Sequence, residues 1–429
     1  MSGAFILLVV VFVGAAVLRL PIALAMIASG LAYLFASGQD VGLAGEQIMN
    51  SMFNNYVLLA VPMFVLAANV MNAGTISERL WAGANVLVGH FRGGLGHVTV
   101  LVSVIFSSMS GSAVADAAGP GMVAMRMMRR VGGYSGGFAA AITAAGATIA
   151  PIIPPSIPLV LYALVSNTSV AALFLGGVIP GLLMAVSLML AVAYVARRGN
   201  LPAGKKHSLA EGRRHLLNAI VPLTLPAILL GGIWSGVFTP TEAAAVAAFY
   251  AMLLAGIYYR SLNWRSLYAV FAESLKSSAV VMLMIAGAFI VNYAVTSEQL
   301  DKALALWISG MDLSPLTFML LVTVILLVLG CLLDTGTLLL VIVPVLLPSV
   351  VLLKIDPVYF GVVAVVNLMI GLITPPYGLL LFVLSALGEV NLREIISAIW
   401  PFITALIVSL LLMVLIPDIV LFLPRAFGY

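Results

Sequence analysis

The sequence predicts an all-α integral membrane protein built as an inverted repeat, in which each half holds one re-entrant helical hairpin and one broken helix. Of its 429 residues, 63% are hydrophobic and 8% are charged, whereas soluble domains carry roughly 25% charged residues. Apolar segments of helix length recur along the chain, which favours membrane helices over a β-barrel. Two proline pairs, Pro154-Pro155 and Pro375-Pro376, lie inside such segments at matching places in the two halves.

Ten apolar stretches are expected to cross the bilayer as helices. The first has no basic region before it, so we expect a retained helix and not a cleaved signal peptide. The ten stretches lie at about 4–18, 20–36, 54–73, 136–165, 170–196, 216–236, 241–260, 277–296, 358–387 and 397–424.

Two further apolar stretches, about 95–126 and 315–353, have small and polar residues at their centres. Ser107–Ser112 interrupts the first, and Asp334–Thr337 interrupts the second. Such a stretch can enter and leave the membrane on the same side as a re-entrant hairpin. Two ordinary spans joined by a short turn are the alternative.

The proline pairs break two of the ten spans, 136–165 and 358–387. Proline lacks an amide donor and clashes with the preceding helical turn. Irregular backbone at membrane depth is tolerated only where it is buried in protein or lines a cavity. Two such breaks in corresponding positions are typical of a secondary transporter that binds its substrate and ions at the breaks.

Basic residues concentrate in segment 197–215, which holds six of the 19 Lys and Arg residues and a single Glu. The positive-inside rule makes this segment a cytoplasmic loop. It separates a first repeat, 1–196, from a second, 216–429. Counting spans outward from the loop places both termini on the outer side of the membrane.

The two halves also share local sequence. Residues 75–80 resemble residues 296–300 at an offset near 220, and each segment begins an amphipathic stretch, 76–91 or 297–311, that precedes a hairpin. An odd number of spans separates equivalent points, so the two repeats are predicted to be inverted.

The hairpin tips and the helix breaks predict two sodium sites. Unwound carbonyls and helix C-terminal ends attract a cation, and helix N-terminal amides attract an anion. Sodium, like other hard cations, prefers oxygen ligands, and Gly111 permits a left-handed turn. We therefore expect an anionic substrate between two sodium ions. The candidate sodium ligands are Ser107, Ser110, Gly111, Ser112, Gly146 and Thr148 in the first half, and Gly330, Thr337, Gly371, Thr374 and Pro375 in the second.

Asp334, Thr335 and Ser156 are the candidates for substrate binding or coupling. A carboxylate near the bilayer centre is costly, so Asp334 is a functional candidate, although it could instead cap the helix that starts at Thr335. Asp116 is a weaker candidate, because it could simply favour a nearby helix N-terminus.

Three other polar residues have structural interpretations. Glu242, in the sequence Thr-Pro-Thr-Glu, fits a capping box with proline at the first helical position. Asn292 and Asn367 are candidates for hydrogen bonds between helices.

Several classes of function are disfavoured. The chain has no nucleotide-binding Walker A sequence, and no histidine is placed to activate a serine, so we expect no enzyme and no cofactor beyond sodium. The single Cys331 gives no disulfide or metal cluster. The net charge of +4 is a signal of membrane topology and is not evidence for nucleic-acid binding.

Eight short motifs follow one another along the chain: Leu20–Ala23, Ser110–Ala113, Gly133-Tyr134, Ile153–Ile157, Ile179–Gly181, Thr239–Ala243, Asp356–Gly361 and Thr374–Gly378. In this order they resemble the large membrane subunit of tripartite ATP-independent periplasmic (TRAP) transporters, the DctM-like family, over essentially the whole chain. At the first tip, the family's frequent Ser-Gly-Ser-Ser is here Ser-Gly-Ser-Ala, with Ala113 in the last place.

The resemblance implies an elevator-type carrier, similar to the ion transporter superfamily, whose hairpins and broken helices slide against a scaffold. It implies sodium-driven uptake of a small organic acid such as a dicarboxylate or sialic acid. It further implies two partners, a periplasmic substrate-binding protein and a small membrane subunit of about four helices. No four-helix extension is present, so we expect the small subunit to be a separate chain. The resemblance assigns ion binding to Ser107, Ser110, Ser112, Gly146, Gly371 and Thr374, and a nearby role to Asp334.

The alternative is a stand-alone carboxylate carrier of related hairpin fold, coupled to sodium or protons. It would act without a periplasmic protein and would form a homodimer. Proton coupling predicts a titrating group at the site, whereas hydroxyls and carbonyls dominate there. The sequence does not identify the substrate.

Overall fold

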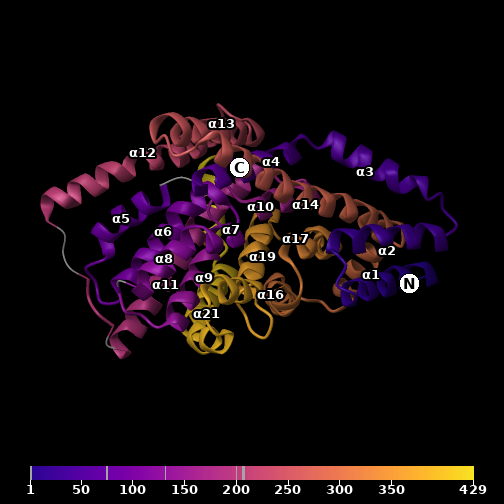
Figure 1. Cartoon of the computed structure of the whole chain (residues 1–429). Helices are drawn as coiled ribbons and strands as arrows, with labels where there is room; N and C mark the ends of the chain where they lie inside the picture. The colour runs from indigo at the N-terminus through magenta and orange to yellow at the C-terminus, as the bar shows by residue number, and fades with distance from the viewer. Residues whose placement is uncertain (1, 74–75, 131, 200, 205–207) are drawn as a thin grey trace.

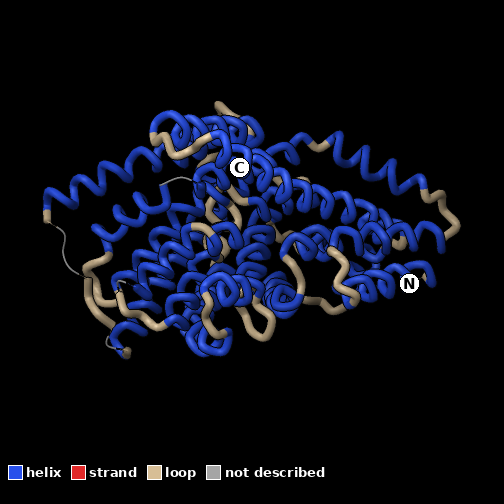
Figure 2. The backbone as a smooth tube through the Cα atoms, in the orientation of Figure 1, coloured by secondary structure: helices blue, strands red, loops and turns tan. Residues whose placement is uncertain are grey.

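The computed structural model describes residues 2–73, 76–130, 132–199, 201–204 and 208–429. Within them the chain is helical and contains no strand beyond an isolated bridge between Arg92 and Ala203. Figures 1 and 2 show the helices packed into an elongated body. The predicted all-α class is confirmed.

The order of helices follows the apolar pattern of the sequence. In the first half the helices are α1 Gly3–Val17, α2 Ile22–Ala36, α3 Gly42–Asn54, η1 Tyr56–Leu59, α4 Ala60–Ala73, α5 Ile76–Val88, α6 Gly94–Ser110, α7 Ala113–Ala118, α8 Pro120–Arg130, α9 Gly136–Ala147, α10 Ile157–Ser166 and α11 Val170–Arg198. In the second half they are α12 Leu209–Trp234, α13 Pro240–Leu253, η2 Leu254–Tyr258, α14 Trp264–Ser297, α15 Leu300–Gly310, α16 Pro315–Leu332, α17 Thr335–Thr337, η3 Leu338–Ile342, α18 Val343–Leu352, α19 Pro357–Gly371, α20 Leu379–Gly388, α21 Leu392–Leu415 and α22 Asp418–Ala426.

Eight helical segments in the described part of the chain are long and apolar enough to cross a membrane. Two of them, Pro315–Leu332 and Thr335–Leu352, are the arms of the second predicted hairpin, so length alone does not separate a hairpin arm from a span. The other six are Tyr56–Ala73, Val170–Arg198, Ala210–Trp234, Pro240–Tyr258, Trp264–Ser297 and Leu392–Leu415.

Some boundaries differ from the predicted ones. The predicted span 277–296 is the second part of α14, which is 34 residues long. The predicted span 397–424 ends early, because Ile416 leaves the helical conformation and α22 starts separately. The helix α3 is not among the predicted spans, because Gly42–Asn54 mixes polar and apolar residues.

Caps fix several helix ends as the sequence indicates. Thr239 and Glu242 form a capping box at the start of α13, with Pro240 at the first helical position, so the structural interpretation of Glu242 is confirmed. Asn292 donates from Nδ2 to the Leu340 carbonyl at 3.0 Å, and Asn367 donates to the Thr323 carbonyl at 2.8 Å. Both asparagines thus join separate helices, as expected.

The two interrupted stretches form helical pairs around a short turn. In the first, α6 packs against α8, and in the second α16 is followed by the continuous segment Thr335–Leu352. The first half of each broken helix packs on the helical pair in the same half of the chain, α9 on α6 and α19 on α16. The second halves cross over, since α10 contacts η3 and α18, and α20 contacts α7. The crossing brings both turns and both breaks to the middle of the molecule, where α7, α10, α17 and α19 lie together (Figure 1).

A second group of helices encloses this centre from the other side. The long helix α14 packs on α2, α3 and α4, and α4 also packs on α13. Figure 1 shows α14 running from the centre toward the N-terminal helices α1 and α2. The re-entrant course of the hairpins and the inversion of the repeats stay predictions.

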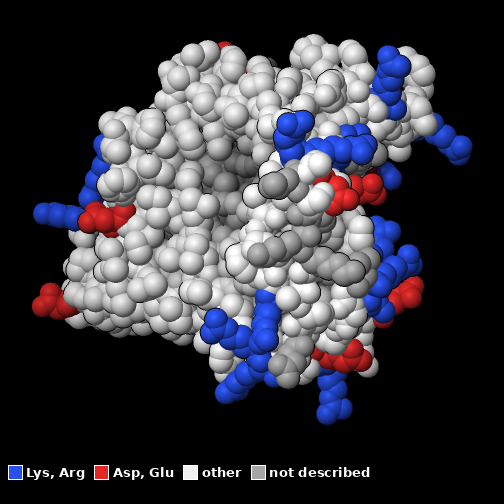
Figure 3. All heavy atoms as spheres, turned by 90° about the vertical axis from the view of Figure 1, so that its left-hand side faces the viewer, with Lys and Arg blue, Asp and Glu red and all other residues white. Residues whose placement is uncertain are grey.

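Basic side chains gather at one end of the fold. Arg197 and Arg198 end α11, and Arg213 and Arg214 lie in the first turns of α12, a helix that begins at the left of Figure 1. On the face in Figure 3, Lys and Arg side chains lie beside a broad surface without charged side chains. Lys205 and Lys206 of the predicted basic loop, and Thr75 of the predicted repeat, lie outside the described residues.

Candidate functional site

The first tip is a tight turn that only glycine fits. The helix α6 ends at Ser110, Gly111 follows with φ of 60°, and Ser112 caps α7 by accepting from the Ala115 amide at 3.4 Å. A Cβ on Gly111 would lie 2.3 Å from the Pro155 carbonyl oxygen. The left-handed backbone and the close approach both require glycine, and they hold the tip against the first proline pair.

The second tip has a carboxylate where the first has a serine. Asp334 caps the segment that starts at Thr335, and its Oδ2 accepts from the Gly336 amide at 2.9 Å and from the Thr337 amide at 3.4 Å. The capping role suggested by the sequence is therefore present. The hydroxyls of Thr335 and Thr337 are buried and have no hydrogen-bond partner among the described residues, so two oxygens at this tip are free to bind a ligand.

The two breaks have similar geometry. The first lies between Ala147 and Ile157 and the second between Gly371 and Leu379, and each contains a cis bond within its proline pair. Ser156 caps α10 by accepting from the Leu159 amide at 3.1 Å and donates its own proton to the Pro151 carbonyl.

A glycine in each broken helix lets it approach the adjacent hairpin arm. A Cβ on Gly146 would lie 2.6 Å from Ser103 Oγ of α6. A Cβ on Gly371 would lie 2.6 Å from the carbonyl carbon of Gly330 in α16. Both halves of the molecule therefore place a helix break directly against a hairpin.

Three of the predicted hydroxyl ligands donate to carbonyls three or four residues earlier in the chain. Ser107 donates to the Val104 carbonyl at 2.5 Å, Thr148 to the Ala145 carbonyl at 2.6 Å, and Thr374 to the Ile370 carbonyl at 2.7 Å. A serine or threonine that donates in this way keeps lone pairs on its oxygen. These hydroxyls can therefore still bind a cation without breaking the bonds that hold them.

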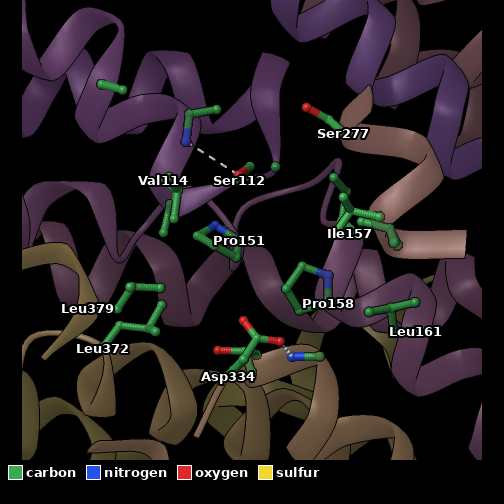
Figure 4. Close-up of a pocket in the computed structure, with 18 of the residues that line it drawn as sticks. Ser112, Val114, Pro151, Ile157, Pro158, Leu161, Ser277, Asp334, Leu372 and Leu379 are labelled. Atoms are coloured by element: carbon green, nitrogen blue, oxygen red, sulfur yellow. Dashed lines mark hydrogen bonds between the residues drawn. The ribbon is translucent and has the colours of Figure 1, made fainter. Parts of the chain in front are cut away.

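The tips and breaks meet at a cavity of about 700 Å³. In Figure 4, Ser112 and Pro151 lie above Asp334, and Pro158 and Leu161 of α10 lie beside it. The only ionisable residues among the described lining are Asp334 and Glu273, and no Lys or Arg lines it. The cavity is of the size of a small-molecule site, and both of these ionisable side chains are acidic.

The structure brings some predicted site residues to the cavity and leaves others in the adjoining turns. Gly111, Ser112, Asp334 and Thr335 line it. The predicted residues that do not line it are Ser107, Ser110, Gly146, Thr148, Ser156, Gly330, Thr337, Gly371, Thr374 and Pro375.

The opposite wall was not predicted. It is formed by Asn69 and Asn72 of α4 and by Glu273 and Ser277 of α14. Asn69 donates from Nδ2 to Ser274 Oγ at 2.9 Å, which joins the two helices. The spacings of three and four residues on apolar helices place each pair on one face, and polar residues inside apolar helices are a signal that could have identified this wall.

Comparisons with known proteins agree on one family. Residues 8–419 match the family described as tripartite ATP-independent periplasmic transporter, DctM component. The chain is 40% identical to the sialic acid TRAP transporter large permease protein SiaM of Vibrio cholerae, over 96% of each chain. It is 38% identical to the 2,3-diketo-L-gulonate TRAP transporter large permease protein YiaN of Escherichia coli, over 95% of this chain and 96% of that one. It is 41% identical to the C4-dicarboxylate TRAP transporter large permease protein DctM of Pseudomonas aeruginosa, over 87% of each.

Solved structures share the fold at lower identity. The YdaH transporter of Alcanivorax borkumensis has a TM-score of 0.63 at 17% identity, with 90% of this chain and 89% of that chain covered. MtrF of Neisseria gonorrhoeae, described as one of a class of antimetabolite efflux pumps, has a TM-score of 0.59 at 14% identity, with 89% and 85% covered. These neighbours and the long apolar helices of the described residues confirm the predicted all-α membrane fold. From the match across residues 8–419 and the identity to three large permeases, the chain belongs to the DctM family of TRAP transporter large permease subunits and is a multi-pass membrane protein, not an enzyme.

Proposed function

We propose that this subunit takes up a small organic acid across the bacterial inner membrane, driven by sodium, together with a small membrane subunit and a periplasmic substrate-binding protein. The relatives are named for sialic acid, 2,3-diketo-L-gulonate and C4-dicarboxylates. All three are carboxylates at neutral pH. The shared chemistry supports an anionic substrate, and the family supports the partners.

The observation that carries sodium coupling is the charge of the cavity. Its described lining contains two carboxylates, Asp334 and Glu273, and no basic side chain. An anion entering this cavity alone meets like charge, and like charges in a partly desolvated site repel strongly. Sodium ions bound first at the tips would offset this negative charge. In this scheme the substrate binds only when sodium is present, and this requirement couples the two fluxes.

The oxygens at the tips and breaks fit sodium as the coupling ion. The unpartnered hydroxyls of Thr335 and Thr337 and the backbone carbonyls of the two breaks are hard neutral ligands. Asp334 adds a negative charge beside the second tip. The N-terminus of α10, which Ser156 caps, favours a negative group at the cavity wall.

We further propose an elevator motion. The hairpins and broken helices form one packed body through the crossing contacts of α10 and α20, and α4 and α14 form the facing wall. The cavity lies between these two groups of helices. The moving body would carry the substrate past this fixed wall from one side of the membrane to the other.

Substrate binding is therefore expected to require sodium. The purified subunit, with any subunit that accompanies it, would be titrated calorimetrically with sialic acid, 2,3-diketo-L-gulonate and succinate in NaCl and in KCl of equal ionic strength. We expect saturable binding of one of these acids in NaCl and none in KCl. Equal affinity in both salts would contradict the coupling scheme.

The tripartite assembly predicts a stable partner. Affinity purification from native membranes in mild detergent, followed by mass spectrometry, is expected to recover a small protein of about four helices in equal amount. Recovery of the chain alone as a stable homodimer would contradict the tripartite assembly and favour a stand-alone carrier.

A further inference from the structure

One hydrogen bond joins the two sides of the first tip. Ser110, the last residue of α6, donates from its hydroxyl to Oδ1 of Asp116 in α7. The two side chains are 1% and 2% exposed. Asp116 does not line the cavity, although its helical neighbours Ala115 and Ala118 do. The carboxylate thus lies behind the tip and contacts it through Ser110.

Ser110 differs from its neighbouring serines in where its proton goes. Ser107 and Ser108 donate to carbonyls of their own helix, Val104 and Ile105, each at 2.5 Å. Ser110 instead donates across the turn to the Asp116 carboxylate. A hydroxyl has one proton and two lone pairs. Because Asp116 takes the proton, the Ser110 lone pairs face away from Asp116, and one receives the Ser112 amide at 3.4 Å.

The carboxylate is poorly suited to a purely structural role. Its second oxygen, Oδ2, is buried and has no hydrogen-bond partner among the described residues. An unsatisfied buried acceptor costs free energy, and Ser112 already caps α7. A neutral residue of the same shape would be expected here if the site served packing alone.

We propose that Asp116 is a positioning residue for the first sodium site, where it holds the Ser110 hydroxyl with its lone pair toward the ion and adds negative charge behind that ligand. Carboxylates that hydrogen-bond to a metal's ligands fix their orientation and raise their basicity, and their loss typically weakens metal binding. The inference rests on the sodium coupling proposed above. It makes the first tip the counterpart of the second, with one carboxylate beside each site.

The test measures sodium binding without transport. Sodium that binds only the folded state stabilises it by RT ln(1 + [Na+]/Kd), so the rise of the unfolding temperature with NaCl concentration gives an apparent dissociation constant. NaCl would replace KCl at constant ionic strength, on the purified subunit with any accompanying subunit. Removing a residue that orients a ligand costs roughly 10- to 100-fold in metal affinity, and Asp116→Ala is expected to raise the apparent dissociation constant by about this factor.

Two further variants separate positioning from folding. Asp116→Asn keeps an acceptor for the Ser110 proton but loses the charge, so we expect a smaller increase in the apparent dissociation constant for sodium than from Asp116→Ala. Asp116→Ala in a Ser110→Ala background should weaken sodium binding less than Asp116→Ala does alone, because the hydroxyl that Asp116 orients is already gone and only the charge is lost. Ser108→Ala removes the neighbouring hydroxyl and serves as the matched control, with wild-type sodium affinity expected. If Asp116→Ala does not fold, the Asn variant and its combination with Ser110→Ala answer the same question.

The outcomes distinguish this inference from the proposed function. If the wild-type protein shows no sodium-specific rise, sodium coupling itself is wrong. If the wild type responds and the Asp116 variants keep its apparent sodium affinity while only lowering the unfolding temperature without sodium, Asp116 is structural and the inference is overturned. An Asp116→Ala change that weakens sodium binding equally with Ser110 present and with Ser110 replaced by alanine would also overturn it.

Discussion

Replacing Asp334 with asparagine is expected to reduce sodium-driven uptake about 10- to 100-fold while leaving the fold intact. Asparagine keeps an oxygen that can accept from the Gly336 and Thr337 amides, so the cap persists. The variant loses the negative charge that faces the cavity. A contact with a charged group contributes about 1.5–3 kcal/mol, and each 1.4 kcal/mol or so is a factor of ten in affinity. Uptake into proteoliposomes with the partner subunits, as a function of sodium concentration, measures the loss.

Asp356→Asn is the matched control for Asp334. Asp356 caps α19 in the same way, since its Oδ1 accepts from the Val358 amide at 2.8 Å and from the Tyr359 amide at 3.3 Å. It does not line the cavity. We expect wild-type uptake from this variant. Wild-type uptake from Asp334→Asn as well would reduce Asp334 to a cap.

Gly371→Ala is expected to disrupt the second half of the site, whereas Gly330→Ala is tolerated, although the two residues touch. A Cβ on Gly371 would lie 2.6 Å from the carbonyl carbon and 2.8 Å from the Cα of Gly330, and backbone atoms cannot yield cheaply. Overpacking of this kind lowers the free energy of unfolding by about 1–3 kcal/mol. A Cβ on Gly330 would meet nothing closer than 3.4 Å, which is ordinary contact.

The asymmetry of this pair provides its own control. Thermal unfolding of both variants in detergent is expected to show a lower midpoint for Gly371→Ala only, and uptake should fall with it. Gly231→Ala, on a helical face with nothing within 4 Å of the new Cβ, controls for the substitution itself. Equal destabilisation by Gly371→Ala and Gly330→Ala would contradict the close approach of α19 to α16.

The sequence predicted the parts of the site whose residues are unusual within a membrane helix. Proline pairs in apolar helices, small and polar residues at Ser107–Ser112 and the acid Asp334 all stand out against hydropathy. The structure brings two tips and two breaks together, as the sequence suggested. Each of these signals is local, because it lies in a single stretch of the chain that cannot form a regular lipid-exposed helix.

What the sequence did not show depends on contacts between distant segments. The facing wall from Asn69, Asn72 and Glu273 arises only once α4 and α14 pack against the tips. The bond between Ser110 and Asp116 spans six residues across a left-handed glycine and joins two separate helices, so no single helical period predicts it. The crossing of α10 and α20 to the opposite halves likewise follows from tertiary packing.

The central claim is that sodium binds the tips of this subunit before the substrate. The most direct test is the unfolding temperature of the purified wild-type protein, with any accompanying subunit and no substrate, as NaCl replaces KCl at constant ionic strength. The account predicts a rise that grows with sodium concentration and that potassium does not produce, because a ligand that binds only the folded state stabilises it by RT ln(1 + [L]/Kd). An unfolding temperature that does not change as sodium replaces potassium would contradict it.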